Sequence, residues 1–203
     1  MRCDANRFPL SDGTRTAAAV ARDSFQRVVH VRRADAGDAE VVAGIHFLAN
    51  WRAYGELTGA PSAEAHERGD WAEQQLEGYR RLWHRQLAAG QSGNPIFVVE
   101  TDQQVAGFCE AAGNRARGIG EIVGLYIDPE HWREGLGRAL VTEVVRWFKQ
   151  RRVATVVLWV LEPAVEARAF YKALGWKPDG ARRAERSVVE GALTGVRYRR
   201  DLT

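Results

Sequence analysis

The segment Trp132-Arg-Glu-Gly-Leu-Gly137 has the residue types that hold a phosphate group. Gly135 and Gly137 allow a sharp backbone turn and leave the N–H groups of the next helical turn uncovered. Those N–H groups, the positive end of the helix dipole and the guanidinium groups of Arg133 and Arg138 favour an anion. A phosphate or pyrophosphate site is one interpretation, and a helix that simply begins with glycine is the other. The six residues alone do not separate them.

Spacing excludes two common phosphate-binding motifs. The dinucleotide motif Gly-x-Gly-x-x-Gly needs a third glycine, and Leu140 stands in that position. The chain also contains no Gly-x4-Gly-Lys-Ser/Thr sequence. Because neither Cys-x-x-Cys nor His-Glu-x-x-His spacing occurs, the sequence predicts no metal site.

A strand and a helix flank the glycine segment. Residues Glu121–Ile127 are mostly apolar and of strand length, and Asp128-Pro129 ends the strand because proline cannot donate a ladder hydrogen bond. After Gly135 the apolar residues have the spacing of a helix that lies on a sheet: Leu136, Leu140, Val144 and Phe148. The apolar run 153–160 is typical of a buried parallel strand and completes a right-handed strand–helix–strand unit.

The rest of the chain supplies further strands and helices. Residues 28–33 alternate as a first strand, and a helix opens near Ala36 with an apolar face of Val41, Ile45 and Leu48. Residues 51–62 contain two glycines and a proline, so we expect a loop. The other expected elements are a helix at 71–89, hairpin strands at 95–100 and 105–111, a helix with Pro163 in its first turn that ends at Gly175, a loop at 176–180, and hairpin strands at 186–190 and 196–200.

Composition indicates one globular domain. A chain of 203 residues that is 45% hydrophobic suits a single domain, here residues 28–203, with an extension of irregular pattern at residues 1–27. No apolar stretch reaches about 18 residues, so we expect no membrane span. Cys3 and Cys109 lie far apart, which favours reduced thiols and a cytoplasmic location. The net charge of +3 carries no nucleic-acid signal, because basic clusters alternate with acidic and apolar residues.

The stretch from Glu121 to Val141 resembles the signature motif of the GCN5-related N-acetyltransferase (GNAT) superfamily. In that family a strand, an Arg/Gln-x-x-Gly-x-Gly/Ala loop and a helix hold the pyrophosphate of acetyl-CoA. Here Trp132 stands where the motif has Arg or Gln, and Arg133 or Arg138 could supply the charge. The resemblance implies cofactor contacts from Arg133, Glu134, Gly135, Leu136, Gly137 and Arg138.

A second stretch, Ala167-Arg-Ala-Phe-Tyr-Lys-Ala-Leu-Gly-Trp176, is similar to another segment of the superfamily, Ala-x-x-Phe-Tyr-x-x-x-Gly-Phe. It implies that Ala167 and Phe170 lie beside the pantetheine arm of the cofactor. The asparagine usual six residues before the Phe is replaced by Ala164. Together the two motifs and the element order imply the α/β GNAT fold, a central mixed, splayed β-sheet flanked by helices, over residues 28–203.

The resemblance also implies a base. Glu121 occupies the position of the catalytic glutamate in histone acetyltransferases of the superfamily. An amine must lose a proton before it attacks a thioester, and a carboxylate can take that proton directly or through a water. The alternative is that Glu121 is a solvent-facing acid on a strand.

Two further roles complete the reaction. Backbone N–H groups of the splayed strand near Leu125, Tyr126 and Ile127 could stabilise the oxyanion. Tyr171 is placed by the motif to protonate the leaving thiolate, because a phenol can donate to a thiolate of slightly lower pKa. The alternative for Tyr171 is a core tyrosine beside Phe170.

The expected function is therefore transfer of the acetyl group of acetyl-CoA to a primary amine. Sequence does not identify the acceptor, which could be a small molecule or a protein. Trp51, Tyr54 and Trp71 are either walls of an acceptor pocket or core residues. Two alternatives remain: a module that binds acyl-CoA without transfer, and an interaction module that pairs as a homodimer through the final hairpin.

Overall fold

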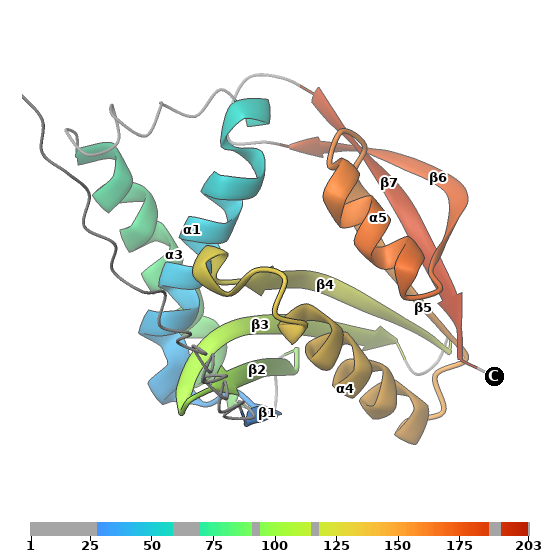
Figure 1. Ribbon diagram of the computed structural model, residues 1–203, viewed down its shortest axis with the longest axis horizontal. Helices are drawn as coiled ribbons and strands as arrows, with labels where there is room; N and C mark the ends of the chain where they lie inside the picture. Colours follow the sequence, from blue (N-terminus) through green and yellow to red (C-terminus); the bar gives the residue numbers. More distant parts are fainter. Residues whose placement is uncertain (1–27, 59–69, 91–93, 115–117, 187–191, 203) are drawn as a thin grey trace, which may run out of the picture.

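The structure, a computed structural model, describes residues 28–58, 70–90, 94–114, 118–186 and 192–202. The elements follow one another as β1 (Val29–Arg33), α1 (Ala39–Thr58), α3 (Asp70–Ala88), β2 (Ile96–Thr101), β3 (Gln104–Asn114), β4 (Ile119–Ile127), α4 (Leu136–Gln150), β5 (Thr155–Leu161), α5 (Val165–Ala173), β6 (Lys177–Arg186) and β7 (Ala192–Asp201) (Figure 1). The 3-10 turns η1 (Ala36–Asp38) and η4 (Pro129–His131) precede α1 and α4. This order confirms the predicted α/β class. The predicted extension at residues 1–27 lies outside the described residues.

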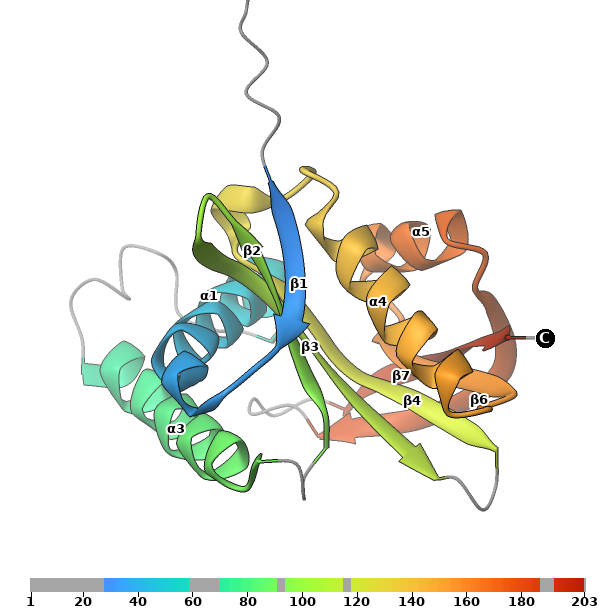
Figure 2. The same cartoon turned by 90° about the horizontal axis from the view of Figure 1, so that it is seen from below.

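Seven strands form one mixed sheet in the order β1-β2-β3-β4-β5-β7-β6. Neighbouring strands are antiparallel except β4 and β5, which are parallel and joined through α4. Helices α1 and α3 lie on one face of the sheet, and α4 and α5 lie on the other (Figure 2). The sheet therefore has two separate apolar cores, one on each face.

β4 and β5 separate part-way along their length. They pair from Ile119↔Thr155 to Ile122↔Leu158, after which β4 continues along β3 to Ile127 and β5 continues along β7 to Leu161. The separation coincides with a β-bulge, because the β3–β4 register steps from Ala111↔Ile122 to Glu110↔Gly124 and leaves Val123 unpaired. The predicted central splay is confirmed.

Alternation along the strands fills the two cores. The core under α4 contains the predicted helix face, Leu136, Leu140, Val144 and Phe148, against strand residues Val99, Cys109, Ile122 and Leu158. The core under α1 and α3 contains Val42, Ala43, Ile45, Trp83, Leu87, Val98 and Phe108. Burial of these side chains is the main favourable contribution to folding.

The first helix differs from the prediction in two ways. Ile45 is buried as expected, but Val41 and Leu48 are 37% and 39% exposed, and Val42 and Ala43 are buried in their place. The helix is apolar around most of its circumference, so the pattern alone could not select the buried stripe. It also continues to Thr58, so Trp51 and Tyr54 lie in the helix rather than in a loop. Gly55 weakens a helix without ending it.

The C-terminal elements also depart from the prediction. β6 begins at Lys177, where a loop was expected, and the expected strand at 186–190 falls almost entirely outside the described residues. Pro178 is tolerated because β6 is an edge strand, and the register is irregular between Pro178 and Arg182. Pro163 lies before α5 rather than in its first turn, since α5 begins at Val165.

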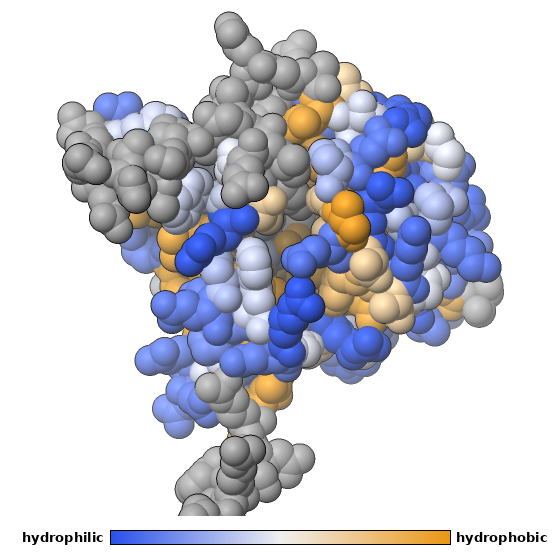
Figure 3. Space-filling view, turned by 45° about the horizontal axis from the view of Figure 1, so that its top comes forward, coloured by the Kyte–Doolittle hydropathy of each residue, from blue (hydrophilic) through white to orange (hydrophobic). Residues whose placement is uncertain are grey.

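The face of the molecule in Figure 3 is mostly hydrophilic, with smaller hydrophobic patches between polar side chains. Within the described ranges, every helix is too short or too polar to cross a membrane.

A buried carboxylate anchors β1 to the start of α1. Asp38 is 6% exposed, and its two oxygens accept hydrogen bonds from Arg32 at 2.7 and 2.8 Å and one from the Asp35 N–H at 2.8 Å. Burial is the largest influence on the pKa of Asp38 and would raise it, but the Arg32 and Asp35 hydrogen bonds and the Arg32 charge together lower it below 3.8. The ionised form is therefore the stabilising one.

We expect Asp38→Asn to lower the free energy of unfolding at pH 7 by about 2 kcal/mol, because Arg32 loses a buried partner. A carboxylate whose pKa is lower in the folded than in the unfolded protein stabilises the fold fully above its unfolded pKa. This stabilisation is lost as the pH falls through its folded pKa. The difference between wild type and variant should therefore shrink below about pH 4. Urea denaturation at pH 7 and pH 3 measures it. Glu143→Gln, which removes a partner of exposed Arg146, is the control, and equal midpoints for the two variants at pH 7 would contradict the assignment.

Candidate active site

The free half of β4 exposes backbone donors. The Asp128 N–H donates to the Ala106 carbonyl at 2.9 Å, so the N–H groups of alternate residues point toward β3. By the same alternation, the N–H groups of Leu125 and Ile127 point to the edge that β5 has left. Tyr126 is different, because its N–H points toward β3 and its side chain packs toward α1. Two of the three predicted oxyanion residues thus have suitable backbone donors.

The loop after β4 is tied back to the same open edge. Asp128 accepts hydrogen bonds from the N–H groups of Glu130 and His131. The Trp132 indole N–H then donates to the Ile127 carbonyl at 2.8 Å. That carbonyl lies on the open edge because the N–H and C=O of one strand residue point the same way. Trp132, which departs from the family motif, therefore fixes the loop by a side-chain hydrogen bond.

α4 begins without a side-chain cap. Gly135 is its N-cap at φ 84° and, having no side chain, makes no cap hydrogen bond. The first N–H groups of an α-helix, here those of Leu136, Gly137 and Arg138, have no partner within the helix and suit an anionic ligand. The Leu136 side chain is 2% exposed, so only its backbone can take part. Gly137 leaves room for Phe170 of α5, since a Cβ there would lie 3.3 Å from the Phe170 Cζ.

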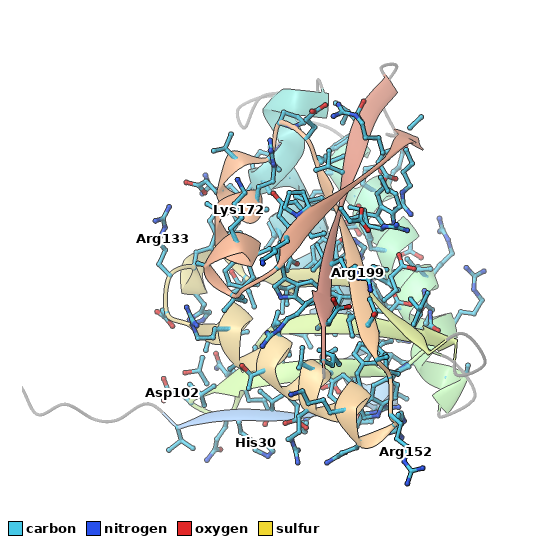
Figure 4. The ribbon with its side chains drawn as sticks, turned by 90° about the vertical axis from the view of Figure 1, so that its right-hand side faces the viewer. His30, Asp102, Arg133, Arg152, Lys172 and Arg199 are labelled. Atoms are coloured by element: carbon cyan, nitrogen blue, oxygen red, sulfur yellow. The ribbon has the colours of Figure 1, made fainter. Side chains whose placement is uncertain are left out.

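The charged side chains of this loop are not equivalent. Arg133 extends outward (Figure 4) and pairs with Glu166 of α5 at 3.0 Å, both side chains being highly exposed. Glu134 pairs with His131 through one carboxylate oxygen at 3.1 Å. Arg138 is exposed, and its guanidinium has no acidic partner within the described ranges. Between the two predicted arginines, Arg138 is therefore the better placed for an anion at the start of α4.

The second motif lies on α5, on the same face as α4. Tyr171 is 8% exposed and packs against the rings of Phe170, Trp176 and Tyr198 at centroid distances of 5.0, 6.1 and 6.5 Å. Ala167 and Phe170 are partly buried against the same core. Tyr198 pairs with Leu158, the last β5 residue that pairs with β4. Tyr171 is therefore close to the point where the strands separate.

Glu121 approaches that point from the opposite face. It pairs with Ala112 on β3 and Val157 on β5, one position before the last β4–β5 pair, so its side chain alternates with buried Ile122 and faces the α1 side. The side chain is half-buried, and its carboxylate makes no hydrogen bond or ion pair with any described residue. The sheet thus separates the two predicted catalytic side chains, and the opening between β4 and β5 connects their two sides.

Sequence reasoning missed His46 on α1. Its ring packs 4.1 Å from the Tyr126 ring, and its Nδ1 accepts a hydrogen bond from the Trp83 indole N–H at 3.0 Å. Burial lowers the pKa of His46 to about 3. A single histidine in an apolar helix carries no motif that could have identified it.

The other candidates are less informative. Trp71 packs against Phe47 between α1 and α3 at 6.5 Å, which favours a core role. Trp51 lies under the Arg52 guanidinium at 5.9 Å, and the side chain of Tyr54 lies outside the described residues. Cys109 is fully buried, and burial raises the pKa of its thiol, so it is not a nucleophile. In the described part of the chain, His, Cys, Asp and Glu side chains form no group of three or more placed for a metal ion.

Residues 51–176, more than half of the chain, match the acetyltransferase (GNAT) family. The chain belongs to this family. The GNAT chain is 29% identical over 120 residues to an uncharacterised N-acetyltransferase of Methanocaldococcus jannaschii, covering 57% of this chain and 50% of the relative. It is 33% identical over 70 residues to the ribosomal protein bS18-alanine N-acetyltransferase of Escherichia coli, covering 34% and 47%. The chain thus spans about half the length of the curated relatives it matches.

Solved structures share the GNAT fold. The PaiA N-acetyltransferase of Thermoplasma acidophilum, solved with coenzyme A, superposes with a TM-score of 0.63 at 18% identity, over 84% of this chain and 98% of that one. YncA of Salmonella typhimurium, solved with acetyl-CoA, gives 0.60 at 18%, over 87% and 95%. At such identities the similarity establishes the fold.

We expect Gly135→Ala to weaken the binding of inorganic pyrophosphate roughly tenfold, because a side chain at φ 84° costs about 1–2 kcal/mol and shifts the loop. Isothermal titration measures the affinity, and circular dichroism checks the fold. Gly78→Ala is the control, because a Cβ there meets nothing within 4 Å and Gly78 lies inside α3. Unchanged pyrophosphate affinity in Gly135→Ala would argue against an anion site at this helix start.

Proposed function

We propose that this protein is an N-acetyltransferase that moves the acetyl group of acetyl-CoA to a primary amine. The observation that carries the proposal is the junction of three features at one place: the uncapped start of α4, the open edge of β4, and Glu121 and Tyr171 on opposite faces of the strand opening. GNAT membership and the coenzyme A and acetyl-CoA bound to PaiA and YncA support it.

The α4 end would hold the pyrophosphate of the cofactor. The N–H groups of Leu136, Gly137 and Arg138 point out of the helix start, and the Arg138 guanidinium adds a charge that is free for phosphate. Trp132 holds the loop to β4 in place of the usual Arg or Gln. The pantetheine arm carries amides that suit the open edge of β4, with Phe170 and Ala167 of α5 beside it.

Glu121 would accept the proton of the amine. A primary ammonium with a pKa near 10.4 is almost wholly charged at pH 7, so a base raises the reactive fraction. Glu121 suits this role because it is partly accessible and has no cationic partner among the described residues. The proton passes to the carboxylate directly or through one water.

The carbonyl and the sulfur need separate groups. As the new N–C bond forms, the N–H groups of Leu125 and Ile127 would stabilise the negative charge on the carbonyl oxygen. As the C–S bond breaks, Tyr171 would give its phenolic proton to the sulfur. Tyr171 would donate its proton from one face of the sheet and Glu121 would accept a proton on the other face, so the two proton transfers are kept apart.

We propose only the chemical class of the acceptor, a primary amine. The relative that acts on ribosomal protein bS18-alanine makes peptides with an N-terminal alanine a suitable first panel beside small polyamines and amino acids. A homodimer through β6 is a further proposal: β6 is an edge strand, although Pro178 and its irregular register weaken strand pairing there. The cytoplasmic location also stays a prediction.

The first test is titration with acetyl-CoA. We expect Arg138→Ala to weaken binding about tenfold, because one charge-assisted hydrogen bond to phosphate is worth about 1.5 kcal/mol. Arg133→Ala is the matched control and should weaken binding less than about threefold, because the Arg133 charge is already paired with Glu166. Absence of acetyl-CoA binding by the wild-type protein would overturn the proposed function. If Arg133→Ala weakens acetyl-CoA binding more than Arg138→Ala does, the assignment of Arg138 to the phosphate is overturned.

The second test is turnover, followed by release of free thiol over the amine panel. Glu121→Gln and Tyr171→Phe should each lower kcat about 10²-fold or more while the affinity for acetyl-CoA is kept. The deficit of Glu121→Gln should shrink toward pH 10, because the amine then loses its proton to water. Glu77→Gln, on the exposed face of α3, should have wild-type kcat. Binding without turnover of any amine would favour an acyl-CoA-binding module.

A further inference from the structure

His46 contacts the end of β4 that carries the proposed oxyanion donors, through the ring of Tyr126. Four rings surround it: Tyr79, Trp83, Phe108 and Tyr126, at centroid distances of 4.4, 5.5, 5.7 and 4.1 Å. Two of them come from α3, one from β3 and one from β4. His46 therefore links both helices of its face to the sheet.

A hydrogen bond sets the orientation of the imidazole. Because Nδ1 accepts the Trp83 indole N–H, the neutral ring carries its proton on Nε2. The Trp83 side chain is almost fully buried, so its N–H depends on this acceptor. Tyr79 is fixed in turn by the Asn50 side-chain N–H, which donates to its hydroxyl at 3.0 Å. The His46 imidazole is thus held in one orientation by Trp83 and Tyr79 of α3.

Tyr126 transmits that orientation to the backbone. It lies between Leu125 and Ile127, whose N–H groups face the strand opening. Its ring also covers Gly124, where a Cβ would lie 2.7 Å from the Tyr126 Cε2. Beyond Ile122, β4 keeps β3 as a neighbour but has lost β5, so the β3 hydrogen bonds and the packing on its two faces together determine where these N–H groups lie.

We propose that His46 is a positioning residue for acyl transfer: held by Trp83, it packs on Tyr126 and so fixes the oxyanion donors of β4. This rests on the proposed function only for its catalytic consequence. The ordering of the strand end is a property of the protein without ligand. His46 packs on Tyr79, Trp83, Phe108 and Tyr126, none of which belongs to the start of α4, so acetyl-CoA affinity should not depend on it.

The first arm of the test needs no turnover. Hydrogen exchange of the protein without ligand, read at the Tyr126 and Asp128 amides, whose N–H groups point toward β3, should be faster in His46→Phe than in wild type. Peptides from the paired part of β5, Thr155–Leu158, should exchange at the wild-type rate. Unchanged exchange at the end of β4 would overturn the proposal, and equal acceleration in both segments would overturn it in favour of a general loss of stability.

The second arm uses turnover and two double variants. His46→Phe and Tyr126→Leu should each lower kcat about tenfold with little change in acetyl-CoA affinity, and the double variant should lose no more than either alone, because the effect passes through Tyr126. Fully additive losses would overturn this route.

In the other double variant, His46→Phe with Trp83→Phe, both polar partners are replaced by apolar rings, so thermal stability should largely return. If kcat returns with it, His46 is merely structural. If kcat stays low, positioning is confirmed. A wild-type protein that binds acetyl-CoA but acetylates no amine removes the proposed function, and the exchange experiment then decides the role of His46 alone.

Discussion

The loss of hydrogen bonding between β4 and β5 beyond Ile122 is the constraint on which the rest of the structure depends. A strand edge inside a protein carries N–H and C=O groups that need partners, and a sheet normally supplies them. Here the bulge at Val123 turns β4 away from β5 and leaves the donors of Leu125 and Ile127 directed into the opening. An extended ligand with amide groups satisfies such an edge as a neighbouring strand would.

The surrounding elements keep the opening in place. Phe148 of α4 packs directly on Gly120, at the paired end of β4, where any side chain would clash with its ring. At the free end, Tyr126 covers Gly124 on the other face. The Phe148 and Tyr126 rings therefore pack on β4 from opposite faces, each at a glycine. The Trp132 indole N–H donates to the Ile127 carbonyl, which ties the loop before α4 to the open edge of β4.

The electrostatics of the site follow from which charges are already paired. About half of the described arginines have a carboxylate partner, as Arg133 has Glu166 and Arg197 has Asp179. Arg138 at the α4 start and Glu121 on the α1 face have no ion-pair partner among the described residues. A modest net charge of +3 therefore says little about function, whereas one unpaired cation beside free N–H groups and one unpaired acid beside the strand opening suit a phosphate ester and an amine.

The sequence by itself determined the order of elements, the helix face of α4 and the glycine turn before it, because apolar periodicity and glycine backbone freedom are local properties. It also selected Glu121 and Tyr171 as candidate catalytic residues through their family motifs. Only the tertiary structure decided that these two lie on opposite faces and that Arg138 is free while Arg133 is paired, since both depend on residues distant in the chain. The buried stripe of α1, with Val42 in place of Val41, and the contacts of His46 likewise depend on packing between helices and sheet, which no local pattern encodes.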